Sequence, residues 1–300
     1  MGQNPRWIKA GIIYAQTQRT VDRQFLFKPD LVITNIIGAS AARAQASHPV
    51  HIYWIEFNIN HEHCGIGALS DSQEHLDNLI RFKQTFHRLV AREINEYLGR
   101  EGALFSSPSR DCECLDDQSL EQQFFYALTN PVKDGLVDKV KHWKGISSWQ
   151  ALANGKNEYF TYFDKTAWHK AGGKSSGKAI QAFAKRVCIN YTPLPSMQSM
   201  SQKQRQTYIR RQCEKLENHF RELRQRTTGQ VVGSKRLARL DHRQRPATRA
   251  VRTRKPLCHA STQAAAKEYK DAYRRFACIQ LCFNPLSCWN VQCGVSSRLH

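Results

Sequence analysis

The hydrophobic positions in the first part of the chain follow the spacing of strands in three places. Residues 50–57 and 64–69 are rich in β-branched and aromatic side chains, which favour the pleated geometry of a strand. An apolar segment over residues 9–17 predicts a first strand before them. Strands of this kind need helices to cover their apolar faces, so we expect a sheet with packed helices.

Two segments next to these strands have helical spacing instead. Residues 29–46 place small and apolar side chains at the intervals that line one face of a helix. Residues 76–97 carry a longer apolar stripe, which follows the N-cap candidates of residues 70–74 and ends at Gly99. The pattern therefore predicts two helices, of which the second is long and amphipathic.

A third helix is predicted over the residues that follow Ser119. Ser119 to Gln122 matches a capping box, which satisfies the free amides of a first helical turn. Pro131 disfavours helical geometry in the residue before it, so we expect this helix to end at Asn130. Between the amphipathic helix and this one, Cys112-Glu113-Cys114 is predicted to lie in a loop.

The order of these elements predicts the fold class. An antiparallel sheet with helices packed on it, an α+β sandwich of the ferredoxin-like type, accommodates a strand, a helix, two strands and two helices. From residue 155 onward the pattern becomes helical and basic. Its clearest element is a helix over residues 201–225 with an apolar stripe and an arginine face, and residues 243–256 are expected to form a loop-rich arm.

The net charge of +20 is concentrated in this second half of the chain. Residues 167–258 hold 22 lysines and arginines against four acidic residues, which is typical of a protein that binds a polyanion. A solvated surface is the simpler explanation for scattered lysines, but arginines mixed with aromatic residues favour nucleic acid. The residues predicted to contact DNA are Arg205, Arg210, Arg211, Arg221, Arg224 and Arg226.

Two histidines, a tyrosine and an asparagine supply the candidate chemistry. His61 and His63 are two positions apart where a strand is predicted to begin, so they project to the same side and can share one divalent ion. Tyr126 and Asn130 are one helical turn apart and can face the same point, so the amide can be a third ligand. By spacing alone Tyr126 would be a core aromatic residue. Its combination with the other three residues favours a nucleophile instead.

These residues lie in motifs that resemble a known family. Residues 60–63 (Asn-His-Glu-His), residues 126–137, which begin Tyr-x-x-x-Asn-Pro, and residues 143–148 resemble the single-tyrosine HUH transposases, in particular the REP-associated tyrosine transposases of bacteria. The resemblance extends over residues 10 to 150 and, more loosely, over the basic extension.

The resemblance implies the HUH nuclease fold and a metal-dependent reaction on DNA. It implies that His61, His63 and Asn130 hold Mg²⁺ or Mn²⁺, while Tyr126 attacks a DNA phosphodiester and keeps the 5′ phosphate. The implied substrate is single-stranded DNA with a hairpin, which is cut and transferred in DNA transposition or in REP-type hairpin processing. The protein would then be an enzyme whose partners are DNA and a divalent metal.

Glu62 departs from the family pattern, which has a bulky apolar residue between the two histidines. Glu62 shares the apolar side of the predicted strand with Cys64, Ile66 and Ala68, where an unpartnered polar group costs about 2 to 7 kcal/mol. We therefore expect Glu62 to have a partner. Otherwise it would weaken the site, reach the metal through a bulge, or be harmless at an open edge.

Two other functions are compatible with the same sequence. A catalytically inactive or domesticated DNA-binding protein, derived from such a transposase, would keep the fold and the basic extension. A phosphohydrolase that uses the His-x-His pair would need acidic ligands close to it, and Glu56 is the nearest acidic residue before the pair.

Three parts are expected along the chain: an HUH-type domain over residues 1–155, a basic helical extension over residues 156–276 and an atypical Cys-rich tail over residues 277–300. The four cysteines of the tail are spaced by four, six and five positions, which matches zinc sites poorly. No secretory signal is apparent, and polar residues within residues 276–295 disfavour a membrane helix. We expect a cytoplasmic, nucleoid-associated bacterial protein, a monomer or homodimer, without membrane contact.

Overall fold

The first six β-strands and α-helices run in the order strand, helix, strand, strand, helix, strand. In the computed structural model, which describes residues 8–9, 11–227, 229–247 and 256–282, they are β1 (Ile13–Arg19), α1 (Leu31–Ser47), β2 (His51–Phe57), β3 (His61–Gly67), α2 (Gln73–Leu98) and β4 (Arg110–Cys114). The strands pair antiparallel in the order β2-β3-β1-β4, and β7 (Cys258–His259) adds to β4 in parallel. The first four strands have the ferredoxin-like order, so the predicted α+β fold class is confirmed.

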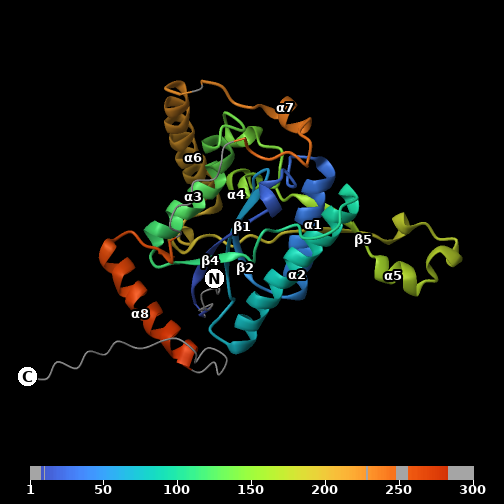
Figure 1. Cartoon of the computed structure of the whole chain (residues 1–300), viewed down its shortest axis with the longest axis horizontal. Helices are drawn as coiled ribbons and strands as arrows, with labels where there is room; N and C mark the ends of the chain where they lie inside the picture. Colours follow the sequence, from blue (N-terminus) through green and yellow to red (C-terminus); the bar gives the residue numbers. More distant parts are fainter. Residues whose placement is uncertain (1–7, 10, 228, 248–255, 283–300) are drawn as a thin grey trace, which may run out of the picture.

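The sheet lies between two layers of helices (Figure 1). α1 and α2 cover one face, and α3 (Asp117–Lys133) covers the other. α6 (Gln202–Gln225) packs on α3, and α4 (Trp149–Asn154) packs on α6. Because side chains alternate along a strand, β3 directs Glu62 and Cys64 toward α2 and its two histidines toward α3.

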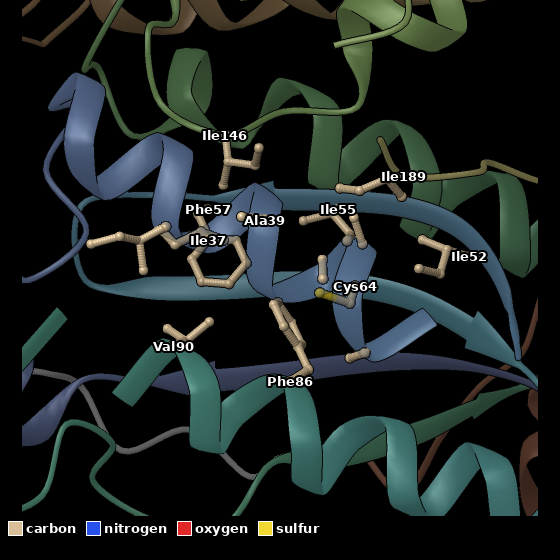
Figure 2. Packing of buried hydrophobic residues seen from close by; sticks show 14 of the residues in the cluster. Ile37, Ala39, Ile52, Ile55, Phe57, Cys64, Phe86, Val90, Ile146 and Ile189 are labelled. Carbon is tan, nitrogen blue, oxygen red and sulfur yellow. The ribbon is translucent and has the colours of Figure 1, made fainter. Parts of the chain in front are cut away.

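The core between the sheet and the pair α1 and α2 is made of aliphatic and aromatic side chains. Figure 2 shows Phe57 and Cys64 of the sheet between Ile37 of α1 and Phe86 of α2. The rings of Phe57 and Phe86 meet edge-on, with centroids 6.1 Å apart. Burial of each such side chain stabilises the fold by about 1.5 to 3 kcal/mol. The packing on this face therefore holds the strands in place for the residues on the opposite face of the sheet.

The observed ends of α2 agree with those predicted from the sequence, whereas the ends of α3 do not. Ser72 caps α2 by accepting a hydrogen bond from His75 N, and Gly99 ends the helix with a left-handed φ of 59°, as predicted. The capping box predicted to begin at Ser119 is wrong by three residues. Asp116 is the N-cap of α3, and Ser119 is the third helical residue, whose hydroxyl group completes the box.

α3 also continues past the end predicted for it. The helix includes Pro131 and ends at Lys133 rather than at Asn130. Proline removes one amide donor, yet Asp134 N still donates to Asn130 O, and the last turn buries Pro131 and Val132. The apolar contacts of this turn outweigh the local preference against a helical residue before proline.

The strand boundaries need smaller corrections. β1 begins and ends later than the predicted residues 9–17, and β3 begins earlier than residue 64, so that both histidines lie inside it. The predicted loop at Cys112-Glu113-Cys114 is wrong, because these residues belong to β4. Their partner is β1, about a hundred residues earlier in the chain, and such a pairing leaves little trace in local periodicity.

The basic extension contacts the first part of the chain at several points. β5 (Tyr159–Phe163) and β6 (Ala184–Cys188) form a separate antiparallel sheet that packs on α1. α6 matches the predicted amphipathic helix and is capped by Ser201. The domain boundary at residue 155 stays a prediction.

The remaining elements are α5 (Lys165–Lys170), α7 (Ser234–Ala238), α8 (Gln263–Cys282) and the 3-10 helices Val21–Arg23, Val140–His142, Gly173–Ser176, Ile180–Phe183 and Pro195–Met197.

Two expectations lie largely outside the described residues. They are the loop-rich arm, of which residues 248–255 are not described, and the Cys-rich tail, of which residues 283–300 are not described. Within the part of the chain that the structure describes, no helix has the length and apolar character needed to cross a membrane.

Gly65 of β3 leaves the space that the ring of Trp54 fills. A Cβ atom on Gly65 would lie 2.1 Å from that ring, which packs edge-on against Phe124 of α3 with centroids 5.9 Å apart. We expect Gly65→Ala to destabilise the protein by about 1 to 3 kcal/mol, because a rigid ring and the helix behind it must shift. Urea unfolding measures the loss. Gly67→Ala on the same face of β3 is the control, because its nearest neighbours would lie 3.3 Å away or more. Equal losses in the two variants would contradict this explanation.

Candidate active site

β3 places both histidines on the face of the sheet that α3 covers. Their ring centroids are 5.0 Å apart, and the rings are nearly perpendicular at 86°. His61 Nδ1 lies 2.8 Å from Asn60 Oδ1 and donates to it, which leaves His61 Nε2 available to a ligand. In the register of the sheet, Arg19 and Thr17 of β1 are opposite His61 and His63.

α3 brings Tyr126 and Asn130 to this pair. The ring centroids of His63 and Tyr126 are 5.4 Å apart, and the rings meet at 89°. Phe124 and Phe125 are buried and anchor the helix, while Tyr126 is only half-buried. Asn130 is 1% exposed, and its Nδ2 lies 3.3 Å from His63 Nε2. The structure therefore brings together all four residues that the sequence singled out for chemistry.

Asn58, in the turn between β2 and β3, orients the amide of Asn130. Asn58 Nδ2 donates to Asn130 Oδ1 and also to Asp134 Oδ2, at 3.0 Å in the second case. A carboxylate can only accept, so Asp134 fixes the orientation of the Asn58 amide, and Asn58 in turn fixes that of Asn130. No sequence motif singled out Asn58 or Asp134 for this role.

Both histidines are neutral at pH 7. Burial lowers the pKa of His61 to about 4, although the carboxylate of Asp134 acts in the opposite direction. Burial and the neighbouring His61 lower the pKa of His63 well below its ordinary value, and the charges of Lys133 and Arg19 add to this. A neutral imidazole keeps a lone pair, so both rings can bind a cation at neutral pH.

The donor set fits a divalent cation that keeps open coordination positions. His61 and His63 offer two imidazole nitrogens, and Asn130 would add an amide oxygen once its side chain turns over, since Nδ2 faces His63 and Oδ1 accepts from Asn58. Among the residues that the structure describes, no third His, Cys, Asp or Glu joins the pair to make a metal-binding group. Water or phosphate oxygens would have to complete the coordination of such an ion.

Two cationic side chains beside the histidines were missed by the sequence reasoning. Lys133 lies two helical turns after Tyr126, and its Nζ donates to Tyr126 Oη at 3.2 Å. The spacing of seven residues within one helical motif is the signal that would have revealed it. Arg19 of β1 is opposite His61, and no motif pointed to it. Together the two cations make this face of the sheet suited to a phosphate group.

Glu62 lies on the opposite face of β3 and has its own partners. It is fully buried; its Oε1 accepts a hydrogen bond from Gln16 Nε2 at 2.9 Å and lies 2.6 Å from Nε2 of His87 in α2. The expectation of a partner is thus confirmed. The alternative of a bulge toward the metal is wrong, because β1 and β3 pair in unbroken register through Glu62.

A cleft of about 650 Å³ opens beside Tyr126 and His63. It follows β1 and β4 and is bordered by β7 and α8 from the C-terminal part of the chain. This volume is in the usual range for ligand sites. The basic and aromatic side chains that line it include Arg19, Arg110, His259, Tyr269 and Tyr273.

The six arginines predicted to contact DNA lie on α6 or directly after it, but not in one environment. Half of them donate hydrogen bonds to main-chain carbonyl groups of this chain; these are Arg205, Arg210 and Arg224. Arg210 and Arg224 thereby hold α6 to α4 and α3. Arg221 contacts Asn218, and Arg211 and Arg226 are exposed. DNA contact by this set stays a prediction.

Comparisons with known proteins give one structural similarity. A chain from a structure of a REP-associated tyrosine transposase bound to a REP hairpin aligns with a TM-score of 0.41 and 15% identity. The alignment covers 51% of this chain and 86% of that chain. No family model matches the sequence, and no curated protein matches it.

The pair of Glu62 and His87 can be tested by a double-mutant cycle. We expect His87→Leu to destabilise the protein by about 3 kcal/mol, because it leaves a buried carboxylate without its main partner. The double variant Glu62→Leu/His87→Leu removes both polar groups and should recover most of this loss. Urea unfolding of the four proteins measures the coupling. A double variant that loses the sum of the two single losses would show that the side chains are not coupled.

Proposed function

We propose that this chain is a transposase-like endonuclease and strand transferase, which cuts single-stranded DNA through a 5′-phosphotyrosine intermediate. One observation carries the proposal. Tyr126 of α3 stands against His63 of β3, in a site that also holds His61 and Asn130. These four residues belong to the two motifs that resemble those of the HUH transposases.

A divalent cation, Mg²⁺ or Mn²⁺, is part of the proposal. His61, His63 and Asn130 would hold it, and when bound it would polarise a phosphate oxygen as a Lewis acid. The chain's own contribution is to keep both imidazoles neutral. Asn130 would bring its oxygen to the ion only after its side-chain amide turns over, because Oδ1 accepts a hydrogen bond from Asn58.

Tyr126 supplies the nucleophile in this mechanism. Its Oη attacks the phosphorus atom, the bond to the 3′ oxygen breaks, and the 5′ phosphate stays on the tyrosine. Lys133 Nζ, 3.2 Å from Oη, stabilises the negative charge that develops there as the phenol gives up its proton to solvent. The phosphotyrosine conserves the energy of the broken bond, so a 3′ hydroxyl group can reseal it without a nucleotide cofactor.

The surroundings of Tyr126 support DNA as the substrate. Arg19 and the cleft beside Tyr126 offer a phosphate-binding cation and room for a strand. The preference for a hairpin rests on the resemblance of the motifs to those of the REP-associated transposases. The exposed arginines of α6, Arg211 and Arg226, are further candidates for contacts with the phosphate backbone.

A DNA-binding protein without cleavage is the second candidate. It is favoured by the hydrogen bond that Asn58 makes to Asn130 Oδ1, since this bond directs the amide oxygen away from His63. The phosphohydrolase alternative has less support, because no acidic residue joins the histidine pair among the described residues.

The decisive measurement is whether the protein forms a covalent adduct with DNA. The protein is incubated with Mn²⁺ and labelled single-stranded hairpin oligonucleotides drawn from the DNA that flanks its gene, and adducts are separated under denaturing conditions. We expect an adduct that Tyr126→Phe, His61→Ala and chelation by EDTA each abolish, because the nucleophile or the metal is then missing. Salt-sensitive binding without any adduct, across metals and hairpins, would favour the second candidate.

The role of Lys133 gives a separate prediction. We expect Lys133→Ala to slow adduct formation by about 10- to 100-fold, because the charge on Tyr126 Oη then loses its nearest donor. Lys133→Arg should restore part of the rate. Circular dichroism and urea unfolding of each variant check that the fold is intact. A rate unchanged in Lys133→Ala would remove Lys133 from the mechanism.

A further inference from the structure

The segment between β5 and β6 forms an arm that the proposed chemistry does not use. At its base, Phe160 fills the space over Gly38 of α1, and Asn35 exchanges two hydrogen bonds with the main chain of Thr161, at 2.7 and 2.8 Å. The tip, residues 164–183, contains α5 and projects away from the sheet (Figure 1). The arm is therefore anchored at its base, and the ion pair of Lys165 with Glu96 of α2 holds the beginning of the tip to the rest of the chain.

Hydrogen bonds within the tip give it a defined shape. Asp164 Oδ1 caps α5 by accepting from Ala167 N at 2.9 Å, and Asp164 N donates to Phe183 O at 3.0 Å. The indole nitrogen of Trp168 donates to Lys178 O at 2.9 Å. Charges on such a tip are held near fixed positions, which reduces the entropy lost when a partner binds.

The charge of the arm is strongly one-sided. Residues 164–186 include six lysines and arginines and one acidic residue. Lys165 and Lys185 have anionic partners in Glu96 and Asp164, at 2.5 and 2.7 Å. The other three lysines of the tip, beside Lys165, are exposed and form no ion pair with any residue that the structure describes; they are Lys170, Lys174 and Lys178.

We infer that the tip of this arm binds the phosphate backbone of double-stranded DNA. Lysines act on phosphates as point charges, and three of them without anionic partners suit a regular array of phosphates. Single-stranded DNA is bound mainly on exposed aromatic rings, yet Trp168 and Phe183 of the tip are partly buried. The exposed rings of the arm, Tyr159 and Phe163, lie on β5 at its base and not among the lysines of the tip. The inference rests on the proposed function in one respect, since that function identifies the polyanion bound by the tip as DNA.

Salt dependence of binding tests the inference without any need for cleavage. The affinity of the full chain for a duplex of about 20 base pairs is measured by fluorescence anisotropy between 50 and 300 mM salt, a range in which each phosphate contact contributes about 0.9 to the slope of log K against log salt. The test variant is Lys170→Gln/Lys174→Gln/Lys178→Gln. The control is Lys28→Gln/Lys165→Gln/Lys185→Gln, which removes the same charge from lysines that already have partners in the protein.

We expect the test variant to lower the slope by about 2 to 3 and to weaken duplex binding about tenfold or more at 0.15 M salt. The control should stay close to the unmodified protein. Equal slopes in the test variant and the unmodified protein would overturn the inference, as would equal losses in test and control. A loss seen with single strands but not with duplex would also overturn it. Adduct formation on a short oligonucleotide without a duplex should be unchanged, so failure of the arm and failure of the catalytic proposal are distinguishable.

Discussion

The alternation of side chains along β3 is the constraint on which both the site and the core depend. A strand that presents His61 and His63 to one face must present the residue between them to the other face. Here that residue is a carboxylate, and it enters a core of aromatic and aliphatic side chains. Gln16 and His87 supply the donors that make its burial tolerable. A shift of register by one residue would turn the histidines toward α1 and α2 and turn Glu62 and Cys64 toward α3, so the pairing with β1 and β2 specifies the site as well as the fold.

α3 completes the site because three contacts determine its position. Its N-cap at Asp116 sets where the helix begins, and Phe124 meets Trp54 in the space that Gly65 leaves open. At the other end, Asn58 ties Asn130 to the turn between β2 and β3. A helix held at its start, middle and end presents Tyr126 with little freedom, and the role of nucleophile proposed for Tyr126 requires such preorganisation. The half-buried ring of Tyr126 is still open to a substrate from the side of the cleft.

Local periodicity predicted the elements that carry long stripes or clear caps, such as α1, α2 and α6. It failed at β4, whose five residues are a strand because β1 lies beside them. The residues of the candidate site likewise divide into those that local sequence reveals and those that it does not. His61, His63, Tyr126 and Asn130 lie in short motifs and were found together. Asn58, Arg19 and His87 are each brought to their partners by tertiary contacts across many residues, and nothing in their local sequence marks them.

The error at Pro131 is the most informative difference between sequence and structure. The local rule that ends a helix before proline would have left Lys133 outside α3. Because the helix continues for one more turn, Lys133 lies on the same face as Tyr126, and its ammonium group reaches the phenol oxygen. The same turn brings Asp134 to Asn58 and, through it, orients Asn130. A local preference is thus overridden where the proposed nucleophile, the cation beside it and the candidate ligand share one helix, and conflicts between local rules and the fold are expected to concentrate at functional sites.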